Sequence, residues 1–124
     1  MESREKMLSF VKHEHELETE YREKLAEAKR KSDVREVFAE YIIRLLKKIN
    51  PDVPASLVHE IKFDEKELKY EFTGELAKIV EEIGFQSDLK AIINRMYETA
   101  QHRYKKIEHD ENLNYFRIGN NAKK

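Results

Sequence analysis

DVREVFAEYIIRLLKKI, residues 33–49, is the stretch that decides the fold, because it is the most apolar segment of a chain in which 40% of residues are charged. Its apolar residues recur every three or four positions, and this spacing places them on one broad face of a helix. Ser32 or Asp33 can cap its start, and Asp33 has Glu36 at the capping-box spacing. Asn50 stands before a proline, which disfavours helical backbone there. We therefore expect a central helix covered by the rest of a small bundle.

Ile43 lies roughly opposite the centre of that apolar face. Two interpretations stay open. It is either a lone exposed isoleucine, which is common on protein surfaces, or the sign of a helix covered on both sides, by its own bundle and by a second subunit. The second interpretation makes Ile43 a candidate for self-association.

Length and composition favour one helical domain. The chain has 124 residues, three glycines and two prolines, so it offers few turns and favours long helices. Its mean hydropathy is −0.83, but the apolar residues are periodic enough to predict folded helices with wide charged faces. We expect an all-α bundle of about four main helices and one short extra helix, with residues 1–119 as the domain and 120–124 as a frayed tail.

Charge and cysteine content narrow the function classes. Lys and Arg number 24 against 25 Asp and Glu, and such a balance is unusual for a protein that mainly contacts phosphates. The absence of cysteine excludes disulfide and thiolate chemistry. No apolar run reaches the length of a membrane span, and the N-terminus does not resemble a signal peptide. We expect a cytoplasmic protein without membrane contact, whose charge-rich composition is typical of thermophiles.

The first thirty residues predict a second feature, a long helix over 2–31 that spans roughly 45 Å. Its apolar stripe is thin, and the helix is much longer than the central one, so part of it must overhang. An overhanging helix most simply pairs with its copy in a second chain, and we expect a homodimer. The candidates for self-association are Met7, Phe10, Val11, Leu17, Tyr21 and Ile43.

Residues 61–84 fit two structures. As a hairpin, residues 61–63 pair with 68–72, but Asp-Glu-Lys-Glu is an unfavourable turn. As a helix, Asp64 and Glu67 form a capping box, and the cost is Gly74 in the helix interior, about 1 kcal/mol. We favour the helix and keep a short hairpin at 61–72, which would make the fold α+β, as the alternative.

The last long helix is expected from Ser87 or Asp88 to about His109, followed by a tail too apolar to be free. Basic and aromatic residues lie along its outer face and in the tail. Charge and stacking surfaces together suit single-stranded nucleic acid, and they equally suit an acidic protein. The partner-binding candidates are Arg95, His102, Lys105, Lys106, His109, Tyr115, Phe116 and Arg117.

Three charged residues fall inside apolar stripes: Glu14 and Glu18 in the first helix and Arg103 in the last. A buried unpaired charge is costly, so these residues either pair or reach solvent at the edge of the stripe. We expect Arg103 to meet Glu14 or Glu18, within the chain or across a dimer.

Catalytic and metal motifs are not apparent. His13 and His15 point about 200° apart on a helix, so they cannot share one metal. Contact of His13, His15 or His102 with a metal across subunits stays open. We expect no cofactor and favour a non-enzymatic interaction or scaffold module. The alternative is a nucleic-acid-binding accessory protein that uses the basic face of the last helix.

Overall fold

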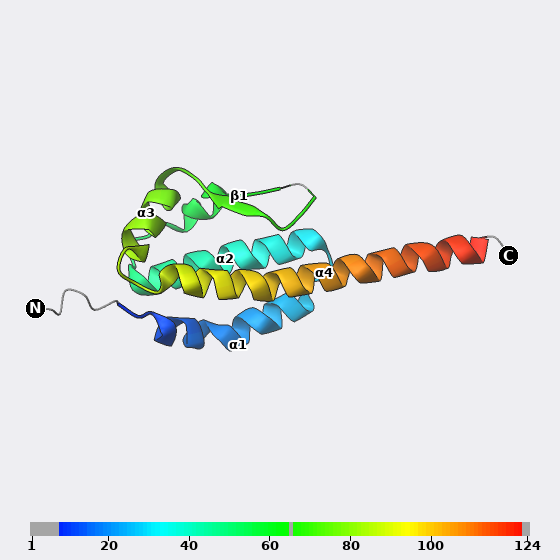
Figure 1. The fold of residues 1–124 in the computed structure, drawn as a ribbon, viewed down its shortest axis with the longest axis horizontal. Helices are drawn as coiled ribbons and strands as arrows, with labels where there is room; N and C mark the ends of the chain where they lie inside the picture. The colour runs from blue at the N-terminus through cyan, green and yellow to red at the C-terminus, as the bar shows by residue number, and fades with distance from the viewer. Residues whose placement is uncertain (1–7, 65, 123–124) are drawn as a thin grey trace, which may run out of the picture.

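The computed structural model describes the main chain of residues 8–64 and 66–122, and side chains as far as residue 113. Three helices lie side by side, and a β-hairpin and a fourth helix cover one side of this layer (Figure 1). The predicted bundle of four main helices and a short extra one is therefore confirmed, with a small antiparallel sheet added. The elements are α1 (Val11–Glu27), α2 (Lys31–Ile49), the 3-10 helix η2 (Ala55–Glu60), β1 (Ile61–Phe63), β2 (Tyr70–Phe72), α3 (Gly74–Gly84) and α4 (Leu89–Ala122).

Helix α2 is the central helix that the sequence predicts. It packs against α1, α4 and η2, so most of its circumference is covered by protein. Its largest side chains, Phe38 and Tyr41, have no exposed surface. Burial of this apolar face is the main stabilising contribution of the helix, because apolar area removed from water drives folding.

Ile43 is buried inside the chain, with 4% of its surface exposed. Helix η2 covers this side of α2, and Ala55 and Val58 lie beside Ile43 along a shallow groove. The idea of a lone exposed isoleucine is therefore wrong. The expectation that α2 is covered on both sides is right, but the second cover comes from the same chain, because the connection after α2 folds back over it.

Helix α1 is shorter than the sequence predicted. Residues 8–10 are not helical, and Leu8 forms an isolated parallel bridge with Ser87. At the other end Ala28 is extended, with φ −63° and ψ 133°, and separates α1 from α2. The predicted overhang of the first helix is therefore wrong for the residues described, since α1 has 17 residues and α2 has 19.

Asp33 stabilises the turn between α1 and α2, although this turn contains no glycine or proline. Its carboxylate accepts hydrogen bonds from the backbone N–H groups of Lys29, at 3.1 Å, and Arg30, at 3.0 Å. These bonds lower the pKa of Asp33 and hold the turn before α2. Ser32 or Asp33 was expected to cap the start of the helix, but α2 begins at Lys31, and Asp33 reaches back from its first turn.

The hairpin replaces the helix that we favoured for residues 64–73. Its loop is closed by Asp64, whose carboxylate accepts hydrogen bonds from the N–H groups of Lys66, at 2.8 Å, and Glu67, at 3.2 Å. These bonds also lower the pKa of Asp64. An aspartate that folds the chain over its own side chain makes a good turn in a longer loop. The prediction that Asp-Glu-Lys-Glu makes an unfavourable hairpin turn is therefore wrong, because the loop is closed by the Asp64 side chain.

An aromatic cluster holds the hairpin on the bundle. The ring centroid of Tyr70 lies 5.0 Å from that of Phe38 on α2 and 5.1 Å from that of Tyr97 on α4. Phe63 of β1 approaches Phe38 edge-on at 6.3 Å. An isolated hairpin is marginal in water, so these contacts decide the hairpin against the helix.

Gly74 begins α3 instead of interrupting a helix. Its φ is +58°, a left-handed conformation that favours glycine, and a Cβ there would collide with the carboxylate of Glu60. Thr73 donates from its N–H and its hydroxyl to the Glu60 carbonyl, which fixes the corner. The glycine that counted against a helix through this region is thus required by the turn.

Helix α4 is much longer than expected. Ser87, one of its two predicted caps, accepts a hydrogen bond from the N–H of Leu89, and the helix then runs to Ala122, past the expected end at His109. Its 34 residues span about 51 Å, against about 28 Å for α2. Figure 1 shows α4 leaving the bundle and ending far from the other elements. We call residues 108–122 the arm.

Candidate functional site: the groove between α1 and α4

A groove runs between α1 and α4, with a cavity volume of about 390 Å³. Its apolar lining comes from both helices, and paired charged side chains stand along it. We call it the α1/α4 groove. It is lined by Val11, Glu14, His15, Leu17, Glu18, Tyr21, Arg22, Arg95, Met96 and Thr99.

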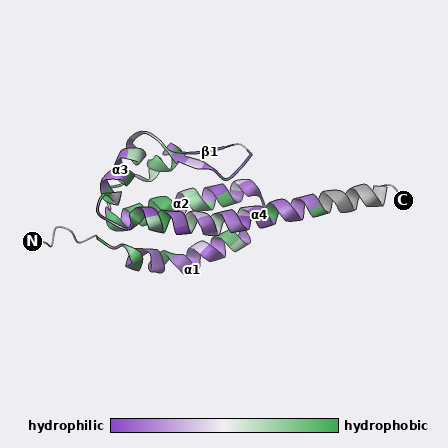
Figure 2. Cartoon of the chain, viewed as in Figure 1, coloured by the Kyte–Doolittle hydropathy of each residue, from purple (hydrophilic) through white to green (hydrophobic). Residues whose placement is uncertain are grey.

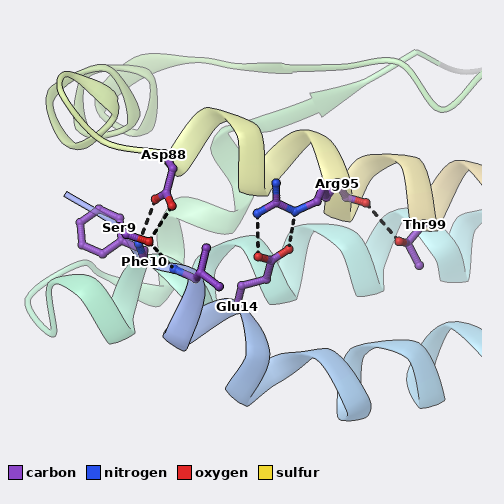
Figure 3. Close-up of polar contacts among 7 residues, drawn as sticks. Ser9, Phe10, Glu14, Asp88, Arg95 and Thr99 are labelled. Atoms are coloured by element: carbon purple, nitrogen blue, oxygen red, sulfur yellow. Dashed lines mark hydrogen bonds and ion pairs between the residues drawn. The ribbon is translucent and has the colours of Figure 1, made fainter. Parts of the chain in front are cut away.

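Asp88 anchors the start of α1 at one end of this groove. Its carboxylate accepts a 2.8 Å hydrogen bond from Ser9 Oγ and a 2.9 Å bond from the backbone N–H of Phe10 (Figure 3). The N–H of Phe10 precedes α1 and has no partner within that helix, so Asp88 satisfies a group that would otherwise need water. Asp88 was predicted as a cap for α4, and its side chain instead fixes where α1 begins.

An ion pair between Glu14 and Arg95 crosses the groove. Arg95 Nε and one terminal nitrogen donate to the two Glu14 oxygens at 3.0 and 2.8 Å (Figure 3). Only 15% of the Glu14 side chain is exposed, against 50% for Arg95. The carboxylate raises the pKa of Arg95. A planar guanidinium bound at two points fixes the relative position of two helices better than a lysine could.

This pairing corrects the expectation for Arg103. Arg103 does not meet Glu14 or Glu18. It donates to the backbone carbonyls of Ala26, at 3.1 Å, and Ala28, at 2.7 Å. These carbonyls lie at the end of α1, where backbone carbonyls have no N–H partner within the helix. The helix dipole also favours a cation there. The position of Arg103 in an apolar stripe correctly indicated that it has a partner within the protein. That partner is the main chain, which a pattern of residue types does not reveal.

Glu18 is bonded to Arg22 on its own helix, at 3.1 Å. Both side chains are largely exposed, 45% and 61%, so this pair contributes little to stability. Of the three charged residues inside apolar stripes, Glu14 alone forms an ion pair between helices. For Glu18 the alternative prediction holds, since its carboxylate reaches solvent at the edge of the apolar stripe.

The candidates for self-association have different places. Leu17 and Tyr21 are buried, with 6% and 3% of their surface exposed, and they form the bottom of the groove. Phe10 and Val11 are partly buried. Ile43 is buried on the far side of α2, so no second subunit is needed to cover it. Met7 lies outside the described residues.

The candidates for partner binding divide in the same way. His102, Lys105, Lys106 and His109 are all exposed on the outer face of α4. Arg95 belongs to the same face, but its guanidinium is bound to Glu14. The side chains of Tyr115, Phe116 and Arg117 lie outside those described. Leu113, the first apolar residue of the expected tail, has 42% of its surface exposed and does not dock on the bundle.

The histidines show no common site. His13 lies 3.4 Å from a Glu16 oxygen and stacks on Phe10 with ring centroids 6.2 Å apart. His15 lines the groove. Across the part of the chain that the structure describes, no three His, Cys, Asp or Glu side chains are grouped so as to hold a metal ion.

Two exposed apolar residues were not singled out from the sequence. Leu8 has 63% and Phe85 74% of its surface exposed. The Leu8 N–H donates to the Gln86 carbonyl at 2.8 Å, which brings both residues to the same end of the bundle. The sequence carries no signal for this, because the bridge joins segments almost eighty residues apart.

Comparison with known proteins returns no match to a family model, to a curated protein or to a solved structure. Within the described residues, no helix has the length and apolar character to cross a membrane.

Proposed function

We propose that the chain is a non-enzymatic helical interaction module that forms a homodimer, with the α1/α4 groove and the arm as its contact surface. The observation that carries this proposal is the length of α4. About 22 Å of helix extends beyond Ile107, the last buried residue of α4 among the side chains described. A partner that packs on this part of α4 would supply the tertiary contacts that stabilise a helix in water.

Two properties of the arm support a partner. Figure 2 shows hydrophilic residues where α4 leaves the bundle, so a hydrophobic core does not hold it there. Its described ion pairs with the rest of the chain join Lys31 to Glu108, at 3.6 Å, and to Glu111, at 3.8 Å. Such half-exposed pairs are weak, and short helices without tertiary packing are marginal in water.

The groove supplies a surface for a helix. Val11, Leu17 and Met96 give it an apolar lining, and the charged residues beside them are already paired within the chain. A helix that binds in a groove gains affinity from such an apolar strip. Helix α1 is then part of the interface, as the sequence suggested. It contributes the side that faces α4. We place the protein in the cytoplasm, where a protein without cysteine needs no oxidative folding.

The test is the solution mass over a concentration series by sedimentation equilibrium. We expect a mass near twice 14.9 kDa. A variant truncated after Ile107 keeps every buried residue of α4 that the structure describes, and is expected to be a folded monomer. A strict monomer at the highest soluble concentration of the full chain would overturn the proposal.

A second candidate is binding of single-stranded nucleic acid by the outer face of α4. It is favoured by the exposure of His102, Lys105, Lys106 and His109 along one side of the helix. Fluorescence anisotropy with a labelled oligonucleotide at about 50 mM salt tests it, and affinity should fall steeply as salt rises. Absence of binding at that salt, or binding unchanged in Lys105→Glu/Lys106→Glu, eliminates this candidate.

A further inference from the structure

We infer that the two copies pair their α4 helices antiparallel about a two-fold axis near residue 108, so that Lys106 of each copy faces Asp110 of the other. This inference rests on the proposed homodimer and adds its geometry and its partner residues. The occupant of each α1/α4 groove is then the arm of the second copy.

The first support is the order of charges at the base of the arm. Lys106 and Asp110 are both exposed, and neither forms an ion pair with another described residue. They lie four residues apart, so they occupy the same side of α4. A lysine preceding an aspartate at this spacing is the less favourable order for pairing within one helix. Both charges are therefore available to a second chain.

The second support is the side of α4 on which they lie. Counting by helical turns from Thr99, a residue of the groove wall, leads through Lys106 to Asp110 and Leu113, all within about 60° around the helix. The charges thus lie at the edge of the outer face of α4 that borders the α1/α4 groove. Leu113, with 42% of its surface exposed, adds an apolar contact on the same side.

The third support is symmetry. A two-fold axis repeats every contact, so an antiparallel pair makes the Lys106–Asp110 contact twice. A parallel pair would place Lys106 against Lys106 and Asp110 against Asp110, which is repulsive. Antiparallel pairing also puts residues 114–122 of one copy level with residues 94–102 of the other. That segment holds Arg95, Met96 and Thr99, the α4 wall of the groove.

The experiment is a charge exchange read by sedimentation equilibrium. Lys106→Glu and Asp110→Lys each create two repulsive contacts, and each should raise the dimer Kd at least about tenfold. An equimolar mixture of the two variants restores opposite charges in both contacts and should form a heterodimer. The double variant Lys106→Glu/Asp110→Lys should self-associate with a Kd within about threefold of the unmodified chain.

The matched control is Lys62→Glu on β1, which makes the same charge change at an exposed residue away from α4. It should leave the Kd unchanged. Circular dichroism verifies that each variant is folded. A monomeric unmodified chain would overturn the proposed function itself. A dimer that is insensitive to Lys106→Glu, or one that neither the mixture nor the double variant restores, would overturn this inference and leave the dimer standing.

Discussion

The phenol of Tyr21 on α1 donates a 2.6 Å hydrogen bond to the main-chain carbonyl of Met96 on α4. Tyr21 is 3% exposed and lies beside Tyr41 of α2, with ring centroids 5.4 Å apart and the ring planes tilted by 45°. One side chain therefore joins the three side-by-side helices of the bundle at the bottom of the α1/α4 groove. The floor of the proposed interface is therefore free to bind apolar side chains, because the polar atom of Tyr21 is satisfied within the chain.

Tyr21→Phe should lower the free energy of unfolding by about 1 kcal/mol at pH 8, the usual net contribution of one hydrogen bond. Urea denaturation followed by circular dichroism measures this. No loss at all would mean that the bond to Met96 does not contribute to stability.

Alkaline pH gives a separate prediction. Burial raises the pKa of Tyr21, and burial raises the pKa of Tyr41 to about 12. The unfolded chain releases these protons near pH 10, while the folded chain still holds them. Their contribution to stability is therefore complete below pH 10 and decreases as the pH rises above it. Urea midpoints at pH 8 and pH 11 should differ less in Tyr21→Phe than in the unmodified chain. An equal difference in both would contradict this.

Ile43→Ala should lower the free energy of unfolding by about 2 to 3 kcal/mol, the lower part of the range for buried isoleucine, because the neighbouring groove lets the site relax. Ile43→Val is the graded control and should cost about 1 kcal/mol. The solution mass should not change in either variant. A loss below about 0.5 kcal/mol would be typical of a surface residue and would contradict the burial of Ile43.

Arg103 and Arg95 both bind α1 from α4, one through main-chain carbonyls and the other through Glu14. Arg103→Ala should cost about 1.5 kcal/mol, because two charge-assisted hydrogen bonds to the end of α1 are lost. In double-mutant cycles with Glu14→Ala, Arg95→Ala should show coupling of about 0.5 to 1 kcal/mol and Arg103→Ala essentially none. The coupling to Arg95 should decrease in high salt. Coupling between Arg103 and Glu14 instead would restore the ion pair that the sequence suggested.

Gly74→Ala should destabilise the chain by about 1 to 2 kcal/mol, the cost of a left-handed backbone for a residue with a Cβ. Gly84→Ala is the matched control, since Gly84 has no left-handed backbone and a Cβ there meets only the flexible side chain of Lys90, at 3.2 Å and beyond. The control should be nearly neutral. Equal costs at both positions would argue against the turn at Gly74.

Local patterns predicted the parts of the fold that depend on local chemistry. The apolar period of residues 33–49 was sufficient for α2, and Ser87 marked the start of α4. The choice between helix and hairpin at 61–72 failed, because it is made by Phe38 and Tyr97, which lie far away along the chain. The sequence identified the charged residues inside the apolar stripes, but not their partners. Helical spacing indicates which side chains face the core, but it does not identify the residues that they contact.

The sequence by itself determined a charged, cysteine-free chain that folds around one apolar helix, because hydrophobic periodicity and capping act over a few residues. Tertiary structure alone decided that Ile43 is covered by η2, that Asp88 fixes the start of α1, and that α4 and not α1 extends beyond the bundle. Each of these depends on contacts between distant segments. Such contacts form only when the whole core is buried together, and no local pattern specifies them.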